Sequence, residues 1–346
     1  MSKTADYSPS SALALNCCQF AYSTQKSSSR SRGDSNKNND WMSKLHANKK
    51  LRDIVMPGTH NSASSTISKW SLFSGVAICQ NLSIYHQLNE GARYLDLRVC
   101  SHQNEIITCH GIVKGNKLSQ IVDEVDDFLN DNPTEFVIVE INNEAPITSS
   151  QKQRLLTLIR STFGERMISY TDTMSWFKLN QVTLGDVHKN KKNILILING
   201  SFAFQRDDGV LYEMKMIARE FACFHNETLL QNKWHNTANP TDLLQRNLTH
   251  LRSLSISDRD YMVCNQFVFT PQPPRNVLDV VCLLFGLKTL QPISLVKQLY
   301  QEDNMLQHFV ANRRDLHWNI ISLDFIDLCQ SFVNFLIETN SSRQNT

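Results

Sequence analysis

The sequence predicts an α/β protein folded as an irregular (β/α)8, TIM-like barrel. Short apolar segments alternate with amphipathic segments along most of the 346 residues, and this alternation is typical of parallel βα units. About eight strand-like segments can be counted, which is the number that such a barrel needs. Some of them, such as 136–141 and 193–198, are apolar almost without interruption, as expected for parallel strands buried on both faces.

Each expected element follows from local periodicity. Strands are predicted where short runs of Val, Ile, Leu or Phe occur, at 51–56, 92–99, 106–109, 136–141, 193–198, 227–230, 262–269 and 320–325. Helices are predicted where apolar residues recur at helical spacing, at 41–45, 80–90, 118–129, 152–163, 212–222, 240–254, 299–312 and 327–338. Side chains at the carboxyl ends of the strands should therefore share one barrel mouth, where the working residues of such barrels lie.

The domain organisation follows from composition. Residues 1–38 are rich in Ser, Asn, Lys and Arg, and 23–39 contain almost no apolar residue, which predicts a disordered tail. We expect the barrel domain at 39–340 and a flexible C-terminus at 341–346. No stretch of about 18 apolar residues is present, so no transmembrane helix is expected. The N-terminus lacks the basic and apolar regions of a secretory signal.

Charge and cysteine content narrow the class of protein. A formal net charge of +2 does not indicate a polyanion partner such as nucleic acid. Nine cysteines are scattered without the spacing of a metal site, and an odd number without a framework favours a reducing compartment. We expect a cytoplasmic monomer.

Four residues with catalytic chemistry occur near predicted strand ends. A sharp turn is expected at Pro57-Gly58, where glycine permits conformations that a Cβ resists, and this turn would deliver His60 to the rim. Asp96 and Arg98 alternate on one face of the strand 92–99, and His110 follows the strand 106–109. A base, an acid and a fixed cation are what phosphodiester cleavage needs without a metal.

Ordered phrases carry a resemblance to a known family. They are PGTHNS (57–62), QLNEGARYLDLRV (87–99), CHG (109–111) and NPTEFVIVEI (132–141), with looser matches at KWHNT (233–237), NQFVFTP (265–271) and NIISLDF (319–325). With these phrases the chain resembles the X domain of phosphatidylinositol-specific phospholipase C, in particular the single-domain proteins and the metal-independent bacterial enzymes. The resemblance covers roughly Trp41–Glu338. It implies a distorted barrel and release of diacylglycerol and a cyclic inositol phosphate.

The resemblance also implies roles for individual residues. His60 would be the general base that takes a proton from the inositol 2-hydroxyl, and His110 the general acid that protonates the leaving oxygen. Arg98 matches the arginine of the bacterial enzymes, where the calcium-dependent animal enzymes carry an acidic ligand. A guanidinium can replace the metal beside the phosphate, so no cofactor is expected. Asp96 would hold Arg98 or a substrate group.

Further residues complete the predicted site. Asp324 would orient His60, with Asp327 as the competing choice. Arg93 lies five residues before Arg98, so it should point to the opposite face and be structural. The predicted substrate-binding residues are Asn61, Glu140, Asn142, Asn199 and Trp234.

Asn61 departs from the bacterial pattern, in which an aspartate follows the first histidine and supports the acid histidine. A neutral amide does not raise a histidine pKa as a carboxylate does. The calcium enzymes carry asparagine at this position as a metal ligand. A calcium site with oxygen ligands from Asn61, Asp96, Glu140 and Asn142 is the alternative, and the adjacent Arg98 cation opposes it.

The predicted partner is a phospholipid membrane surface, contacted peripherally. The apolar run 277–287 either dips into the interface or covers the barrel wall, because about 11 residues cannot span a bilayer. Two rival functions are a phosphodiesterase acting on another phospholipid headgroup and a non-catalytic phosphoinositide-binding barrel.

Overall fold

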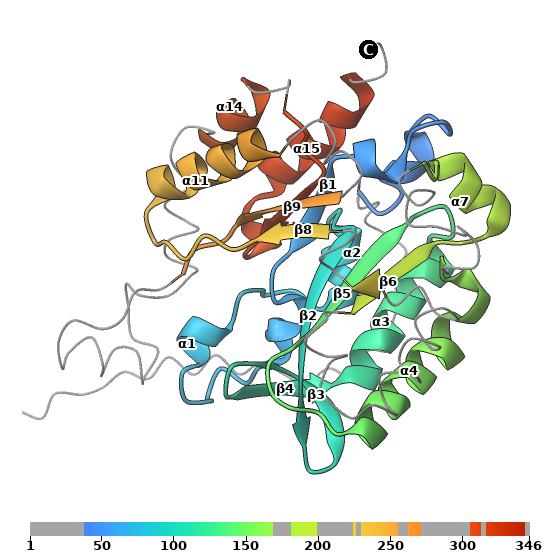
Figure 1. The fold of residues 1–346 in the computed structure, drawn as a ribbon, viewed down its shortest axis with the longest axis vertical. Helices are drawn as coiled ribbons and strands as arrows, with labels where there is room; N and C mark the ends of the chain where they lie inside the picture. The colour runs from blue at the N-terminus through green and yellow to red at the C-terminus, as the bar shows by residue number, and fades with distance from the viewer. Residues whose placement is uncertain are drawn as a thin grey trace, which may run out of the picture. The chain divides into compact units, whose positions relative to one another are not determined.

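A sheet of parallel strands forms the centre of the fold. The computed structural model describes residues 38–168, 181–198, 224–225, 230–254, 262–270, 305–312 and 316–342, which belong to a compact unit spanning Asn36–Thr346. Eight strands follow one another in the order β7-β6-β5-β2-β1-β10-β9-β8, each parallel to its neighbour (Figure 1). They are β7 Phe224–His225, β6 Ile194–Ile198, β5 Val137–Asn143, β2 Tyr94–His102, β1 Met56–Thr59, β10 Ile320–Leu323, β9 Met262–Phe267 and β8 Leu230–Lys233. The predicted α/β, TIM-like architecture is confirmed.

One predicted barrel strand is not part of the parallel sheet. The segment predicted at 106–109 is β3 (Glu105–His110), which pairs antiparallel with β2 and then with β4 (Val113–Lys117). The connection from β2 to β3 is the tight turn at Gln103 and Asn104, both with positive φ. A parallel crossover needs a dozen or more residues, whereas two suffice for a hairpin. The prediction of a parallel strand here was therefore wrong, and His110 stands at the end of a hairpin strand.

The first strand also differs from the prediction. Residues Leu51–Asp53 form a short 3-10 helix, and β1 begins at Met56. Pro57 and Gly58 lie inside β1, so the expected turn at these residues was wrong. Gly58 is needed for space, because a Cβ there would lie 2.7 Å from Cδ1 of Tyr94 on the neighbouring strand. The turn comes after the strand, at Asn61, whose φ is 41°.

The alternation of side chains along β2 and β5 separates the barrel interior from the outer layer. Residues Leu95, Leu97 and Val99 point outward into a buried cluster with the helices α2 (Ile84–Asn89), α3 (Leu118–Asp131) and α4 (Ser149–Phe163). Tyr94 points inward with apolar side chains of several other strands. Asp96 and Arg98 share the inward face with Tyr94, so the same periodicity that builds the core points the polar residues toward the mouth.

The opposite wall is covered by helices from the C-terminal half. A second buried cluster joins β9 and β10 to α11 (Pro240–Ser253), α14 (Met305–Ala311) and α15 (Gln330–Ser342). The other short elements are α1 (Ser74–Ala77), α7 (Leu184–Asn190) and the 3-10 helices η1 (Trp41–Lys44), η2 (Leu51–Asp53), η3 (Ser62–Thr66), η4 (Gly164–Arg166) and η6 (Ile326–Leu328). The predicted helix 212–222 and the apolar run 277–287 lie outside the described residues. Within the described ranges, no helix has the length and apolar character needed to span a bilayer.

A buried ion pair lies at the amino ends of β2 and β5. The Arg93 Nε donates to Glu135 Oε2 at 2.8 Å, and neither side chain is exposed. Glu135 also accepts from the main-chain nitrogens of Met42 and Ser43 at 3.2 Å each, and Arg93 donates to the Asn39 carbonyl at 2.8 Å. Arg93 therefore fastens the segment before β1 to the bottom of the barrel, at the end opposite the carboxyl ends of the strands.

Candidate active site

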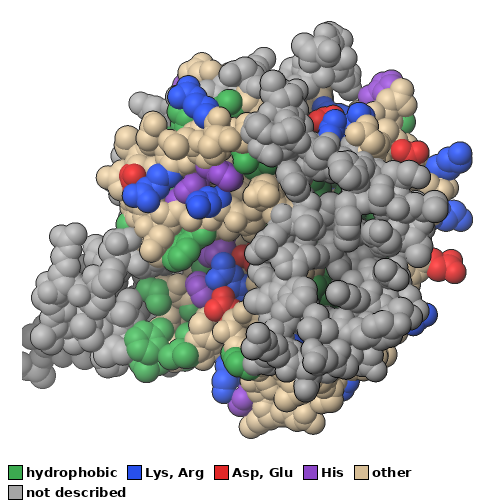
Figure 2. Space-filling model, in the orientation of Figure 1, with side chains coloured by type: hydrophobic (Ala, Val, Ile, Leu, Met, Phe, Trp, Pro, Cys, Tyr) green, Lys and Arg blue, Asp and Glu red, His purple; other side chains and the backbone are tan. Residues whose placement is uncertain are grey.

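The candidate site lies where β1, β2, β5 and β10 end. His60 directly follows β1, and its main-chain nitrogen donates to the Leu323 carbonyl at 3.0 Å. Asp324 directly follows β10. Arg98 and Asn142 are paired in register on β2 and β5. On the face shown in Figure 2, histidine, basic and acidic side chains gather in one place that hydrophobic side chains border.

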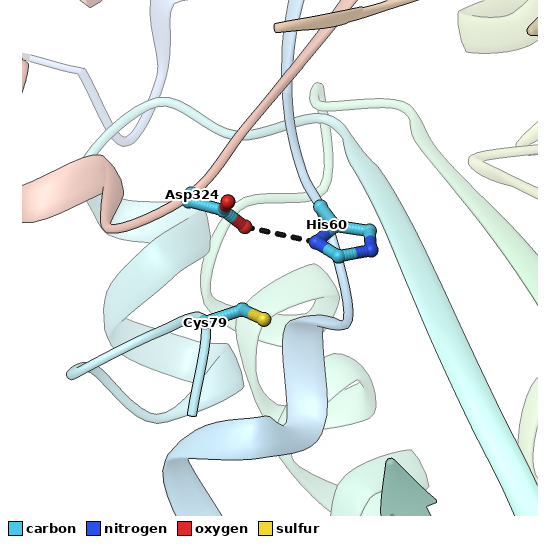
Figure 3. A group of neighbouring side chains, drawn as sticks. All are labelled: His60, Cys79 and Asp324. Atoms are coloured by element: carbon cyan, nitrogen blue, oxygen red, sulfur yellow. Dashed lines mark hydrogen bonds and ion pairs between the residues drawn. The ribbon is translucent and has the colours of Figure 1, made fainter. Parts of the chain in front are cut away.

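The contacts of His60 determine which of its ring nitrogens carries the proton. Nε2 lies 2.9 Å from Nη2 of Arg98. Nδ1 lies 2.8 Å from Oδ1 of Asp324 (Figure 3). A guanidinium only donates, so Nε2 must be the accepting nitrogen. Nδ1 therefore carries the proton and donates it to the Asp324 carboxylate. His60 is 7% exposed, and its Nε2 lone pair accepts from the arginine.

Asp96 is held as a carboxylate by its neighbours. Its Oδ1 accepts from the Asn142 amide at 2.8 Å, and its Oδ2 accepts from the Asn61 main-chain nitrogen at 3.2 Å and from Arg98 at 3.3 Å. Burial alone would raise the pKa of Asp96, but Arg98, His60 and these hydrogen bonds outweigh burial and lower the pKa. A permanent negative charge therefore stands beneath Arg98.

Arg98 is a fixed cation with several partners. Nη1 donates to Oε1 of Glu144 at 2.8 Å, while Nε and Nη2 face Asp96 and His60. Burial lowers the pKa of Arg98, but Asp96 and Glu144 more than compensate, so its pKa is raised. Its side chain keeps 24% exposure, so Arg98 is not sealed from solvent.

His110 faces His60 from the hairpin. The two ring centroids lie 6.2 Å apart with perpendicular planes, a separation that one phosphodiester group can bridge. Nδ1 of His110 lies 2.9 Å from the Ala77 carbonyl oxygen, so this nitrogen donates and Nε2 is the nitrogen available for a substrate. Burial, then the charges of His60 and Arg98, lower the pKa of His110. The main-chain carbonyl therefore orients the ring and fixes the proton on Nδ1, but it does not bring the negative charge of a carboxylate.

The other predicted residues are spread over several levels. Asn61 is buried, and its side-chain nitrogen has no hydrogen-bond partner among the described residues. Glu140 is fully buried one inward position below Asn142, and it accepts from the Tyr94 hydroxyl and from Asn232. Trp234 follows β8 with 52% exposure, and its indole nitrogen donates to Thr270.

Two remaining predictions can be located. Asn199 lies outside the described residues. Asp327, the competing choice to Asp324, lies in η6 and accepts from the Asn81 side chain at 3.0 Å, so Asp324 and not Asp327 contacts His60.

Sequence reasoning missed three residues that build the site. Gln80 is fully buried, and its amide donates to the carbonyls of His60 and Leu323 at 3.1 and 2.8 Å. It therefore clamps together the two loops that carry the His60–Asp324 pair. Glu144 and Cys79 were missed as well. No sequence signal distinguishes these residue types from ordinary loop residues.

The four residues of the alternative calcium site do not all lie at the barrel mouth. Of its four residues, Glu140 is bonded within the barrel interior and lies below the mouth. The cation that accompanies Asp96 is the Arg98 guanidinium at 3.3 Å. A divalent ion at Asp96 would have to share the carboxylate with that charge, so the four residues do not fit a calcium site.

The comparisons with known proteins match the chain to one family. Residues 55–199 match the family described as "Phosphatidylinositol-specific phospholipase C, X domain", a range that includes His60, Asp96, Arg98 and His110 but not Asp324. A 1-phosphatidylinositol phosphodiesterase of Listeria monocytogenes is 33% identical over 121 residues, which cover 34% of this chain and 37% of that protein. PI-PLC X domain-containing protein 2 of Mus musculus is 28% identical over 193 residues, 48% of this chain and 55% of that protein. The chain thus spans about half, or less, of the length of these two relatives.

Among solved structures, a phosphatidylinositol-specific phospholipase C from Listeria monocytogenes superposes with a TM-score of 0.62. The match covers 87% of this chain and 97% of that chain at 21% identity. It shows a shared fold.

Proposed function

Since this chain belongs to the family of phosphatidylinositol-specific phospholipase C X domains, we propose that it is a phosphoric diester hydrolase acting on a phosphatidylinositol-type lipid. The products are diacylglycerol and a cyclic inositol phosphate. The observation that supports this most is the arrangement of His60 between Arg98 and Asp324, with His110 facing it across 6.2 Å. All of these contacts are needed to support the proposed reaction, because the acid, the base and the cation must act on the same phosphate.

The reaction begins at His60. When the substrate binds, the Arg98 N–H group that donates to Nε2 in the empty site turns to the phosphate. The released Nε2 lone pair then takes the proton of the inositol 2-hydroxyl while the hydroxyl oxygen attacks the adjacent phosphorus. The imidazolium that forms is stabilised by Asp324, which already accepts from Nδ1 at 2.8 Å. Because nucleophile and phosphate belong to the same molecule, the attack benefits from a large proximity advantage.

Arg98 acts on the phosphoryl oxygens and His110 on the leaving oxygen. The Arg98 guanidinium neutralises charge on the phosphoryl oxygens, and His110 gives a proton from Nε2 to the diacylglycerol oxygen as the ester bond breaks. The lowered pKa of His110 keeps it neutral in the empty site. A bound phosphate diester brings a negative charge close to the ring, which favours the protonated form that the acid role needs.

An apolar projection beside the site supports action at a lipid surface. Trp70 is 97% exposed, Leu72 57% and Ile112 79%. The first two lie between η3 and α1, and Ile112 lies two residues after His110. Their loops pack together through a small buried cluster that includes Ile67 and Val113. Large exposed apolar side chains grouped on one surface indicate a contact site, and a bilayer interface accommodates them.

Hydrolysis of phosphatidylinositol vesicles tests the proposal. We expect the full-length chain to release a cyclic inositol phosphate, identified by phosphorus NMR, from phosphatidylinositol but not from phosphatidylcholine vesicles. His60→Ala serves as the inactive control. If a phosphorylated headgroup were released from another phospholipid and not from phosphatidylinositol, the result would favour the rival function, a phosphodiesterase acting on another headgroup. Vesicle binding without any product, in a correctly folded protein, would favour the non-catalytic barrel and refute the enzyme.

Vesicle sedimentation tests the membrane surface separately. Trp70→Ala with Leu72→Ala should weaken binding to phosphatidylinositol vesicles while leaving the turnover of a water-soluble phosphodiester unchanged. The control is Leu45→Ala, which shortens a partly buried leucine in the segment before β1, at the amino end of the barrel. Binding that does not change in the double variant would refute this contact.

The buried thiols of Cys79 and Cys109 beside the site fit a cytoplasmic location, which we include in the proposal.

A further inference from the structure

Cys79 is a buried thiol within the candidate site for which the proposed reaction has no use. It is 2% exposed, and its main-chain nitrogen is fixed by a hydrogen bond to the Ser64 hydroxyl at 2.9 Å. Its sulfur lies 3.8 Å from Nδ1 of His110. Figure 3 shows Cys79 next to the His60–Asp324 pair. Cys79 lies on a separate loop and not at the end of β1 or β10.

A second observation at the same place points to a missing ligand. Asp324 is 0% exposed, and one of its carboxylate oxygens, Oδ2, has no hydrogen-bond partner among the described residues. A buried carboxylate oxygen without a partner is costly, since burial removes its water. One ligand atom each from His60, Cys79 and Asp324 lie within 4.8 Å of one another.

We propose that His60, Cys79 and Asp324 form a binding site for a thiophilic divalent cation such as Zn²⁺, and that the bound ion inhibits the enzyme. Sulfur, imidazole nitrogen and carboxylate oxygen together suit zinc, whereas calcium and magnesium prefer oxygen alone. Zinc bonds of about 2.0–2.3 Å imply ligand separations of about 3.3–3.7 Å in a tetrahedral site. The sulfur therefore has to approach the other two atoms, from at most 4.8 Å. Nδ1 of His60 and Oδ1 of Asp324, which lie 2.8 Å apart, have to separate slightly, and side-chain rotation can supply both changes.

The protons explain why the ion inhibits. On binding, the Cys79 thiol loses its proton to solvent and its sulfur becomes a thiolate ligand. The Nδ1 proton of His60 must leave as well, and the ring takes one proton from solvent at Nε2, so one proton is released in total. Nε2 is then a donor facing the Arg98 donor that it accepts from at 2.9 Å in the ion-free site. His60 no longer offers a lone pair to the substrate, and Arg98 has to turn away.

Two charged side chains near the site affect the affinity in opposite directions. The Arg98 guanidinium, 2.9 Å from Nε2 of His60, repels the ion. The Asp96 carboxylate, at 4.0 Å from His60, attracts it.

Zinc titration of the metal-free, full-length protein tests the site without relying on activity. Calorimetry should give a zinc affinity that falls ~10-fold or more in Cys79→Ser, since a hydroxyl is a poor zinc ligand. Cys329→Ser is the matched control, because Cys329 is also buried and its sulfur donates to the main-chain carbonyls of Phe325 and Ile326. Equal affinity in all three proteins would overturn the proposal, because zinc would then bind elsewhere.

A spectroscopic arm covers the case in which Cys79→Ser does not fold. Co²⁺ added to the wild-type protein should produce a sulfur-to-cobalt charge-transfer band in the near ultraviolet, and its absence would overturn the proposal by itself. The inhibition arm rests on the proposed function. Micromolar Zn²⁺ should inhibit phosphatidylinositol cleavage by the wild type more than by Cys79→Ser, each relative to its own zinc-free rate. If no lipid is cleaved, the proposed function fails while the binding arms still decide the metal site.

Discussion

Asp324→Asn separates the two contributions that the carboxylate makes to His60. If the asparagine oxygen faces Nδ1, the same ring nitrogen keeps the proton and only the charge is lost. Hydrogen bonds to charged groups contribute about 1.5–3 kcal/mol and neutral ones about 0.5–1.5 kcal/mol. The difference of about 1–1.5 kcal/mol corresponds to roughly a tenfold loss in kcat. If the amide nitrogen faces Nδ1 instead, the base is lost, and the expected loss is that of general base catalysis, ~10²–10⁴-fold.

The structure favours the smaller loss. Arg98 donates to Nε2 at 2.9 Å, which keeps the lone pair on that nitrogen and therefore keeps the proton on Nδ1. We expect kcat on phosphatidylinositol vesicles to fall about tenfold with little change in KM, because Asp324 is 0% exposed and is proposed to act through His60. Asp327→Asn, which alters an acid bonded to Asn81, is the control and should keep wild-type kcat. Unchanged kcat in Asp324→Asn, in a protein with normal thermal unfolding, would refute the assignment.

Three further predictions concern the acid, the cation and the fold. On natural lipid, His110→Ala should lower turnover by ~10²–10⁴-fold. On a substrate with a nitrophenyl leaving group, which needs little protonation, His110→Ala should recover much of this activity, whereas His60→Ala should stay impaired. Equal impairment of the two variants on the nitrophenyl substrate would contradict the division of roles. Activity should survive calcium chelators, because Arg98 supplies the cation; loss in chelator, restored by calcium, would argue otherwise. Arg93→Met should lower the free energy of unfolding in urea by about 3–5 kcal/mol, because it leaves its carboxylate partner buried and unpaired; a change below about 1 kcal/mol would mean that the pair is not important.

A pH prediction follows from a histidine outside the site. Burial, followed by the charge of His250, lowers the pKa of His235 from 6.5 to about 4. The unfolded chain then binds the proton more readily than the folded chain between these values. His235 therefore favours the folded state fully above pH 6.5, and this contribution is lost as the pH falls toward about 4. Urea unfolding of His235→Asn should be less pH-dependent than wild type across this window; identical slopes would contradict the shift.

Periodicity was enough to predict the architecture but not the pairing of every strand. The continuous apolar runs at 136–141 and 193–198 became β5 and β6, and the amphipathic runs became α3 and α4. The run at 106–109 was predicted to be a parallel barrel strand. An apolar pattern alone does not show in which direction a strand pairs with its neighbour. What decides its direction is the length of the preceding connection, and the Gln103-Asn104 turn was not read as a hairpin signal.

The same limit applies to the site. Residue types with catalytic chemistry, such as His60 and Arg98, could be selected from their phrases. Groups that act through the main chain could not, because the Ala77 carbonyl has the same chemistry as every other carbonyl. Gly58 was assigned to a turn because glycine is common there, whereas the structure needs it for the close approach of the Tyr94 ring.

The hydrogen-bond partners that orient the two histidines differ in how easily a mutation can remove them. His60 depends on a side chain, so a single codon change at Asp324 can alter its partner. His110 depends on the Ala77 carbonyl oxygen, which every amino acid at that position would provide. Only an insertion, a deletion or a change that moves the backbone of α1 can remove it. Point variation among descendants of this chain should therefore impair the base through its support far more readily than the acid.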